Sequence, residues 1–177
     1  LGMNPLNGST VWDATLAAPR GTNDIERLVD LVEGVSRQGN EVCARAYQAA
    51  VACVDTVRGA VTWRRAAAGT VGLHGDDRQV YGVEGDGRVL AWQRANGEPV
   101  WTSDRLRYRN LSAPLVTPRG VLVADNGSWL YLLSLADGAL LNRVKLDSDE
   151  LAAAPVWAGG RYVVVSREGR VMGLQIP

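Results

Sequence analysis

A glycine followed four residues later by a tryptophan recurs along this chain at intervals typical of a stacked repeat. The pairs are Gly8 and Trp12, Gly59 and Trp63, and Gly97 and Trp101. Gly138 has the same frame, with Asn142 in place of the tryptophan. The four glycines are spaced by 51, 38 and 41 residues. A period of about 40 residues predicts a β-propeller or another stacked array, because each unit buries its apolar face against its neighbours.

Further positions repeat in step with these glycines. An apolar residue stands eight positions before three of them, at Val51, Val89 and Leu130. A polar residue stands four positions before all four, at Asn4, Asp55, Gln93 and Ser134. An ordinary β-sandwich does not predict such a period, so the pattern favours repeated sheets of similar construction.

Strands of period two fill the space between the repeated glycines. The predicted pairs are residues 42–47 with 51–55, 80–84 with 88–93, 121–125 with 129–135, and 162–167 with 170–176. Three of the connecting turns contain glycine after an acidic residue or asparagine, which suits tight hairpins because glycine adopts positive φ readily. A related segment precedes the last two pairs, at residues 112–115 and 153–156.

The predicted fold is an all-β propeller of four-stranded blades, each ending in an outer strand with the Gly-to-Trp step. A tryptophan at one fixed position can dock between neighbouring sheets and bury about 200 Å². We interpret the chain as one partial propeller domain over residues 1–177. Residues 1–17 form an outer-strand remnant, 28–66, 69–104 and 111–146 form blades, and 151–177 form an incomplete last blade.

Composition excludes several classes of function. Hydrophobic residues make up 46% of the chain and charged residues 21%, which is typical of globular proteins. The formal net charge is zero, so bulk charge attracts neither nucleic acid nor anionic lipid. The first ten residues, LGMNPLNGST, lack the features of a signal peptide and read as the middle of a strand. We therefore expect the chain to be part of a longer protein.

No catalytic, cofactor or metal site emerges from the residue pattern, and we predict that the protein is not an enzyme. His74 is the single histidine, so no histidine cluster can bind a metal. The acidic residues at 76, 77, 84 and 86 lack the spacing of a calcium loop and are interpreted as turn residues. No helix is predicted after Gly85 and Gly87, so this pair is a hairpin turn rather than a phosphate loop.

The repeat resembles that of quinoprotein-type propellers, and several segments are similar to the BamB family of outer-membrane assembly lipoproteins. The similarity lies in residues 21–30 (GTNDIERLVD), 46–48, 51–55 and 111–115. The resemblance implies an eight-bladed ring of which this chain is the C-terminal half. It also implies a non-catalytic scaffold of the β-barrel assembly machine at the periplasmic face of the outer membrane. The implied anchor is a lipidated cysteine outside this chain, and the implied partners are the periplasmic domains of BamA and other subunits.

The same resemblance implies that Arg27, Leu28 and Asp30 contact BamA from an exposed loop between blades. An alternative is that Leu28 belongs to an inner strand and that Arg27 and Asp30 form a local ion pair. Members of the family tend to have an aspartate two residues after the position of Asp30, followed by Thr-Pro. Residues 32–35 of this chain read VEGV instead, which puts the second acidic contact of the family in doubt. Residues 22–34 also fit a helix with Asn23 as its cap, whereas the family implies a loop running into an inner strand.

Cys43 and Cys53 lie on the two strands of one predicted hairpin. A three-residue loop at 47–49 would place them directly opposite each other, about 4.5 Å apart between Cα atoms. They would then form a disulfide in an oxidising periplasm. A two-residue loop would turn them to opposite faces, and two small buried thiols are the alternative.

Two functions of different class follow from these observations. The first is the assembly scaffold, and the alternative is a ligand-binding or sensor propeller or a degenerate quinoprotein dehydrogenase domain. The half ring would be completed by a missing N-terminal half or by a second copy, whose residues 11–16 would supply the absent outer strand. An open half propeller and a tight four-bladed ring are the other arrangements.

Overall fold

The computed structural model describes residues 1–17, 30–148 and 150–175, and these residues form five antiparallel sheets. The N-terminal pair comprises β1 (Gly2–Met3) and β2 (Thr10–Trp12). Sheet I comprises β3 (Leu31–Gln38), β4 (Glu41–Ala46), β5 (Ala50–Asp55) and β6 (Ala60–Ala66). Sheet II comprises β7 (Leu73–Gly75), β8 (Gln79–Val83), β9 (Val89–Gln93) and β10 (Pro99–Ser103).

The remaining two sheets follow in chain order. Sheet III comprises β11 (Leu115–Thr117), β12 (Gly120–Ala124), β13 (Trp129–Leu133) and β14 (Leu140–Lys145). Sheet IV has three strands, β15 (Val156–Ala158), β16 (Arg161–Val165) and β17 (Val171–Leu174). In every sheet consecutive strands are neighbours, so each sheet is a simple up-and-down meander.

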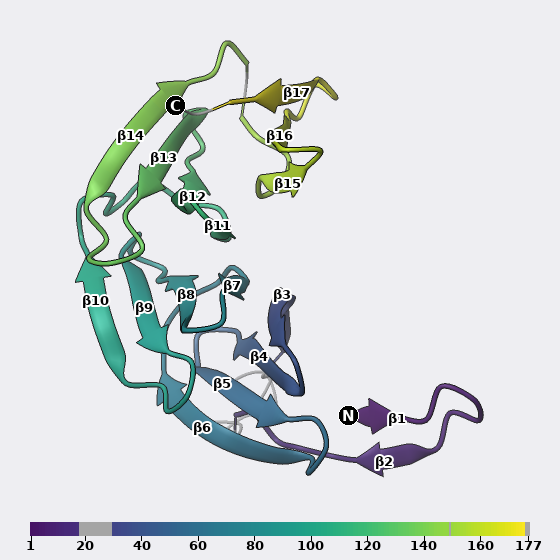
Figure 1. Ribbon diagram of the computed structural model, residues 1–177. Coiled ribbons are helices and arrows are strands. Elements are labelled where there is room, and N and C mark those ends of the chain that lie inside the picture. Colours follow the sequence, from purple (N-terminus) through teal and green to yellow (C-terminus); the bar gives the residue numbers. More distant parts are fainter. Residues whose placement is uncertain (18–29, 149, 176–177) are drawn as a thin grey trace, which may run out of the picture.

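The sheets stand side by side in an arc whose first strands, β3, β7, β11 and β15, lie on the concave side (Figure 1). The fourth strands β6, β10 and β14 lie on the convex side, and the two ends of the arc carry β1–β2 and sheet IV (Figure 1). This arrangement confirms the predicted all-β fold with propeller-like blades. Among the described residues there is no helix long and apolar enough to cross a membrane.

The repeated glycines close the turn into each outer strand. Gly8, Gly59, Gly97 and Gly138 all have φ between 64° and 71°, a region that residues with a Cβ avoid. Each donates its N–H to the carbonyl of the polar residue four positions earlier, over 2.8 to 3.0 Å. In three of these turns the polar side chain also accepts backbone N–H groups: Asn4 from Leu6, Asp55 from Val57 and Arg58, and Ser134 from Ala136. The geometry of the turn therefore explains why the glycine and the polar residue four positions before it both recur.

The core consists of apolar layers between neighbouring sheets rather than one central cluster. The repeated apolar residues Val51, Val89 and Leu130 are completely buried. One layer joins sheets I and II around Val80 and Trp92, and a second joins sheets II and III around Tyr81 and Leu133. A third joins sheets III and IV around Leu122 and Tyr162. Each blade thus buries its faces only against its neighbours, as expected for a stacked repeat.

Two predicted segments differ from the structure. The outer strand expected at residues 11–16 is shorter, because β2 ends at Trp12. The helix considered for residues 22–34 is wrong for its last part, since Leu31–Gln38 is strand β3. Gly34 has a φ of 86° at an irregularity in the pairing of β3 with β4, so it marks a bulge rather than the end of a helix. Residues 22–29 lie outside the described residues.

Candidate partner-binding surface

The predicted contact segment ends at the start of inner strand β3. Asp30 is exposed, and its carbonyl accepts the N–H of Tyr47 from the β4–β5 turn at 2.8 Å. Leu31 and Tyr47 are 60% and 48% exposed. This places a carboxylate beside two exposed apolar groups on a hydrogen-bonded backbone, a combination suited to protein contacts. Arg27 and Leu28 lie outside the described residues.

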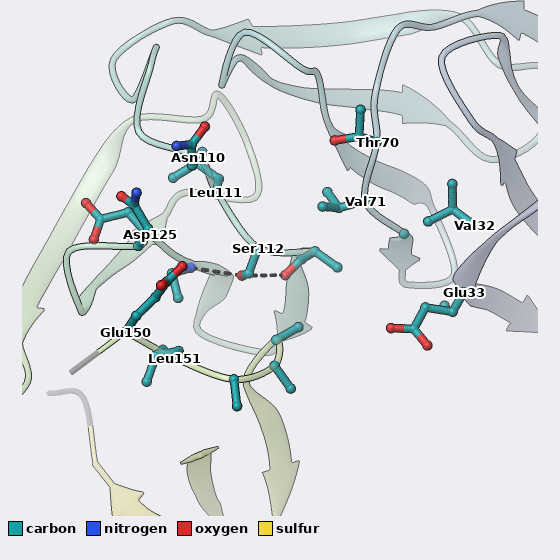
Figure 2. A pocket seen from close by; sticks show the side chains of 18 residues that line it. Val32, Glu33, Thr70, Val71, Asn110, Leu111, Ser112, Asp125, Glu150 and Leu151 are labelled. Carbon is teal, nitrogen blue, oxygen red and sulfur yellow. Dashed lines mark hydrogen bonds between the residues drawn. The ribbon is translucent and has the colours of Figure 1, made fainter. Parts of the chain in front are cut away.

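A cavity of about 640 Å³ lies on the inner side of the arc, next to this segment. Figure 2 shows the short connections that precede the inner strands of successive sheets converging on it. Small residues and backbone dominate the lining, which comprises residues 32–34, 70–72, 110–113, 124–126 and 150–154. No histidine, cysteine or basic residue is among the described residues that line it.

Two polar side chains of the cavity, Ser112 and Asp125, are engaged in structural contacts. Ser112 Oγ accepts the N–H of Ala124 at 3.1 Å and donates to the carbonyl of Ala113 at 2.9 Å (Figure 2). Asp125 accepts a hydrogen bond of 2.8 Å from Tyr131 and lies 3.3 Å from Arg109. Burial and the hydrogen bond to Asp125 raise the pKa of Tyr131 to about 12. Ser112 is therefore bonded to backbone groups, and the contacts given for it include no general base that would activate it as a nucleophile.

The repeated tryptophans connect one sheet to the next. The indole of Trp12 covers Gly59, that of Trp63 covers Gly97, and that of Trp101 covers Gly138, so that a Cβ at each glycine would overlap the ring. The indole N–H groups of Trp63 and Trp101 donate to the carbonyls of Arg94 and Leu135, each three residues before the covered glycine. The motif thus pairs the tryptophan of one outer strand with the turn of the following blade.

Cys43 and Cys53 are bonded to each other across strands β4 and β5, in the register that a three-residue loop predicts. Their Cα atoms are 3.9 Å apart, and both residues are completely buried between sheets I and II. Arg94 of sheet II reaches this point, with Nη1 3.2 Å from the carboxylate of Glu41 and 3.4 Å from Cys43 Sγ. Its Nη2 donates to Ser36 Oγ. The bonded sulfurs and the adjacent cation leave no metal site here.

A second buried arginine crosses the same interface. Arg45 of β4 lies 3.2 Å from Glu84 of sheet II, with side chains 0% and 6% exposed. Burial lowers the pKa of Arg45, while Glu84 opposes that shift. Gly69 and Gly82 flank the guanidinium so closely that a Cβ on either would overlap it. This pair was not predicted, because Glu84 fits a turn residue in the sequence; the glycines at 69 and 82, which leave room for Arg45, are the signal that could have indicated it.

His74, Asp76 and Asp86, which the sequence raised as candidate residues, each have structural contacts. His74 Nδ1 accepts the N–H of Val116 from sheet III at 3.4 Å. Asp76 accepts the N–H groups of Arg78 and Gln79, and Asp86 pairs with Arg88 at 2.9 Å and Arg107 at 3.2 Å. Gly87 has a φ of 86° in the β8–β9 hairpin turn.

Comparison with known proteins assigns the chain to a family. A family model described as outer membrane protein assembly factor BamB matches residues 1–103. A protein of that name from Burkholderia pseudomallei is 31% identical over 98% of this chain and 45% of its own length. Another from Alkalilimnicola ehrlichii is 32% identical over 98% of this chain and 45% of its own length. The chain thus spans about half the length of these relatives.

The solved structures show the same fold. The crystal structure of BamB from Moraxella catarrhalis has a TM-score of 0.87 to this chain at 23% identity. The match covers 98% of this chain and 52% of that one. Because the family model matches more than half of the residues, the resemblance first drawn from residues 21–30 and the blade repeat is confirmed, and the chain belongs to the BamB family of outer membrane protein assembly factors.

Proposed function

We propose that this chain is the C-terminal half of a non-catalytic scaffold that binds the periplasmic domains of BamA in the outer-membrane β-barrel assembly machine. The family match over residues 1–103 supports this, together with relatives named as assembly factors. A chain that covers 45% of such relatives and bends through only part of a ring fits one half of an eight-bladed propeller. The protein would lie at the periplasmic face of the outer membrane, held by a lipidated cysteine outside this chain.

The exposed start of β3 is the observation that carries the proposed contact with BamA. Asp30 is fixed by its backbone bond to Tyr47, and Leu31 beside it is 60% exposed. A rigid backbone lowers the entropy that binding costs, and an exposed leucine and tyrosine can supply apolar anchors. Arg27 and Leu28 precede this point directly and would extend the same surface, with Arg27 forming a bidentate bond to a partner carboxylate.

The proposal is tested by titrating purified BamA periplasmic domains with the full-length protein that contains this chain. Saturable binding is expected, and the 177-residue chain alone should bind more weakly because it offers only part of the family's contact surface. Absence of saturable binding by the full-length protein would contradict the scaffold function. A second assembly subunit added to the titration would reveal whether the propeller bridges partners.

The cavity on the inner side of the arc favours a second candidate function, the binding of a small ligand. Its volume of about 640 Å³ lies within the range of about 300 to 1,000 Å³ typical of ligand pockets. A degenerate quinoprotein would retain affinity for pyrroloquinoline quinone. Titration of the chain with this quinone, followed by tryptophan fluorescence, separates the two functions: a scaffold leaves the fluorescence unchanged, whereas a quinoprotein gives a saturable change.

A further inference from the structure

The connection between sheets II and III carries an aromatic side chain that lies largely in solvent. Tyr108 is 78% exposed, and its φ of 64° lies in the left-handed region that bulky residues rarely adopt. This conformation costs free energy, and such exposure leaves little packing energy to offset the cost. The residue therefore adds little to the stability of the fold, which points to a role in binding.

The backbone at Tyr108 is held in place by the complete four-stranded sheets that it connects. The Tyr108 N–H donates to the carbonyl of Asp86 in the β8–β9 turn at 2.9 Å. Leu106 is buried in the layer between sheets II and III. Gly87 lies so close to the connection that a Cβ there would come within 2.9 Å of the Tyr108 nitrogen. A partner would thus meet a preorganised surface, which lowers the entropy that binding costs.

Positive charge distinguishes this connection from its equivalents between the other sheets. Residues 104–110 read DRLRYRN, with three arginines and one aspartate. The connection at residues 67–72 has no charged residue, and the one at residues 146–155 has three acidic residues and no basic residue. Charge of one sign at one connection favours partners of the opposite sign and fixes where they bind.

The arginines around Tyr108 are more exposed than the carboxylates that accompany them. Arg107 lies 3.2 Å from Asp86, to which Arg88 is also bonded at 2.9 Å, and Arg109 lies 3.3 Å from Asp125. The side chains of the three arginines are 42% to 45% exposed, whereas those of the two aspartates are 28% and 4% exposed. A partner approaching this surface therefore meets the guanidinium groups first.

Arg107 and Tyr108 form one unit at the surface. The guanidinium of Arg107 lies over the ring of Tyr108, 5.0 Å from its centroid. Arginine can give two parallel hydrogen bonds to a carboxylate, and tyrosine offers a rigid ring with a large apolar area. Both are residue types that often dominate the energy of protein contacts. The unit fits a partner that presents a carboxylate next to an apolar side chain.

We propose that Arg107 and Tyr108 form a binding site for an acidic segment of a partner protein. The guanidinium of Arg107 binds a carboxylate of the segment, and the ring of Tyr108 covers the apolar side chain next to it. Arg88 and Arg109 add attraction at longer range. This site is separate from the proposed BamA contact at residues 27–31, which includes none of these residues.

The test is the binding of a short fluorescein-labelled peptide, in which glutamates flank leucine, to the full-length protein that contains this chain. Fluorescence anisotropy should show saturable binding that weakens as the salt concentration rises, because salt screens exposed charges. A matched peptide with glutamine in place of each glutamate should bind about tenfold more weakly or worse, since it lacks the charged hydrogen bond.

Two variants separate a binding role from a structural one. Arg107→Gln should weaken binding of the glutamate peptide by about tenfold. Tyr108→Gly removes the ring and also relieves the strain of the positive φ, so it should weaken binding while the melting temperature stays equal or rises. Arg58→Gln is the control, because it removes an arginine side chain that is 81% exposed in the β5–β6 turn, and should leave the affinity unchanged.

Several results would overturn the proposal. One is the absence of saturable binding by the glutamate peptide, and another is equal binding of the glutamine peptide. An affinity that Arg107→Gln and Tyr108→Gly leave unchanged, or that Arg58→Gln lowers as much as Arg107→Gln does, would also contradict it. A lower melting temperature together with weaker binding in Tyr108→Gly would show that the ring supports the fold instead.

Discussion

The indole of Trp101 lies on Gly138 of the following blade, where a Cβ would come within 2.6 Å of its ring. The glycine therefore serves two purposes at once. It adopts a φ of 68° in the turn, and it leaves room for the ring of the neighbouring sheet. The glycine and tryptophan of one blade do not contact each other but face opposite neighbours, which links each blade to the next.

Replacing Gly97 with alanine tests this double requirement. Its φ is 70° and the ring of Trp63 covers it, so Gly97→Ala adds backbone strain and steric overlap. The overlap should cost about 1–3 kcal/mol beyond the strain. Gly39→Ala is the matched control, because Gly39 has a φ of 56° and nothing within 4 Å of its Cβ position. Denaturant unfolding of both variants gives the loss in free energy of unfolding caused by each substitution. Equal losses for Gly97→Ala and Gly39→Ala would contradict the packing role of Gly97.

Breaking the buried ion pair should destabilise the interface between sheets I and II. Glu84→Gln leaves the charge of Arg45 buried without a counter-charge, at a cost of about 3–5 kcal/mol. The double variant Arg45→Met with Glu84→Gln should recover much of that loss, since it removes the buried charge as well. Arg58→Ala breaks a pair whose arginine side chain is 81% exposed, and should change stability by about 1 kcal/mol or less. A double variant less stable than Glu84→Gln would refute this account.

The bond between Cys43 and Cys53 predicts an absence of free thiols in oxidised protein. Treatment with iodoacetamide under denaturing conditions without reductant should leave the mass unchanged, and prior reduction should add two alkyl groups. Replacing both cysteines with alanine should lower the free energy of unfolding by about 2–4 kcal/mol. Alkylation of both cysteines without reductant would show that the protein holds two buried thiols instead.

His74 predicts a pH dependence of stability that can be isolated because it is the single histidine of the chain. Burial lowers its pKa in the folded state, with Arg94 adding to the effect and Asp76 opposing it. Its contribution is therefore fully present above the unfolded value of about 6.5 and is lost as pH falls through the lower folded pKa. Protonation would also remove Nδ1 as acceptor for Val116. Between pH 7 and 5, the free energy of unfolding should fall less steeply with falling pH in His74→Gln than in the unmodified protein. An equal pH dependence in the two proteins would contradict this assignment.

Sequence alone predicted the blades well because their signals are local and repeated. The turn glycines, the polar residue at Asp55 and the apolar residue at Val51 each act within one strand pair. The repeat also predicted that tryptophan docks between sheets. It could not show that Trp63 covers Gly97, since that contact joins residues of different blades.

The contacts between blades were harder to predict for the same reason. Arg45 and Glu84 lie 39 residues apart, and no periodic signal connects them. Glu84 stands in a turn, where an acidic residue needs no further explanation, so its buried partner escaped notice. The inner cavity likewise arises from short connections of several sheets, whose small residues carry little information singly. The prediction of a contact segment at residues 27–30 rests on family resemblance rather than on any physical pattern.

The measurement that tests the proposed function most directly is the affinity of the full-length protein for BamA periplasmic domains, with variants in the proposed contact segment. Arg27→Ala and Asp30→Ala should each weaken binding by about tenfold or more, since a charged hydrogen bond contributes about 1.5–3 kcal/mol, while the melting temperature stays unchanged. Asp104→Ala is the control, because it removes an exposed carboxylate from a different loop and should leave the affinity unchanged. Unchanged affinity for both variants, or equal losses of affinity and stability, would contradict a BamA contact at this surface.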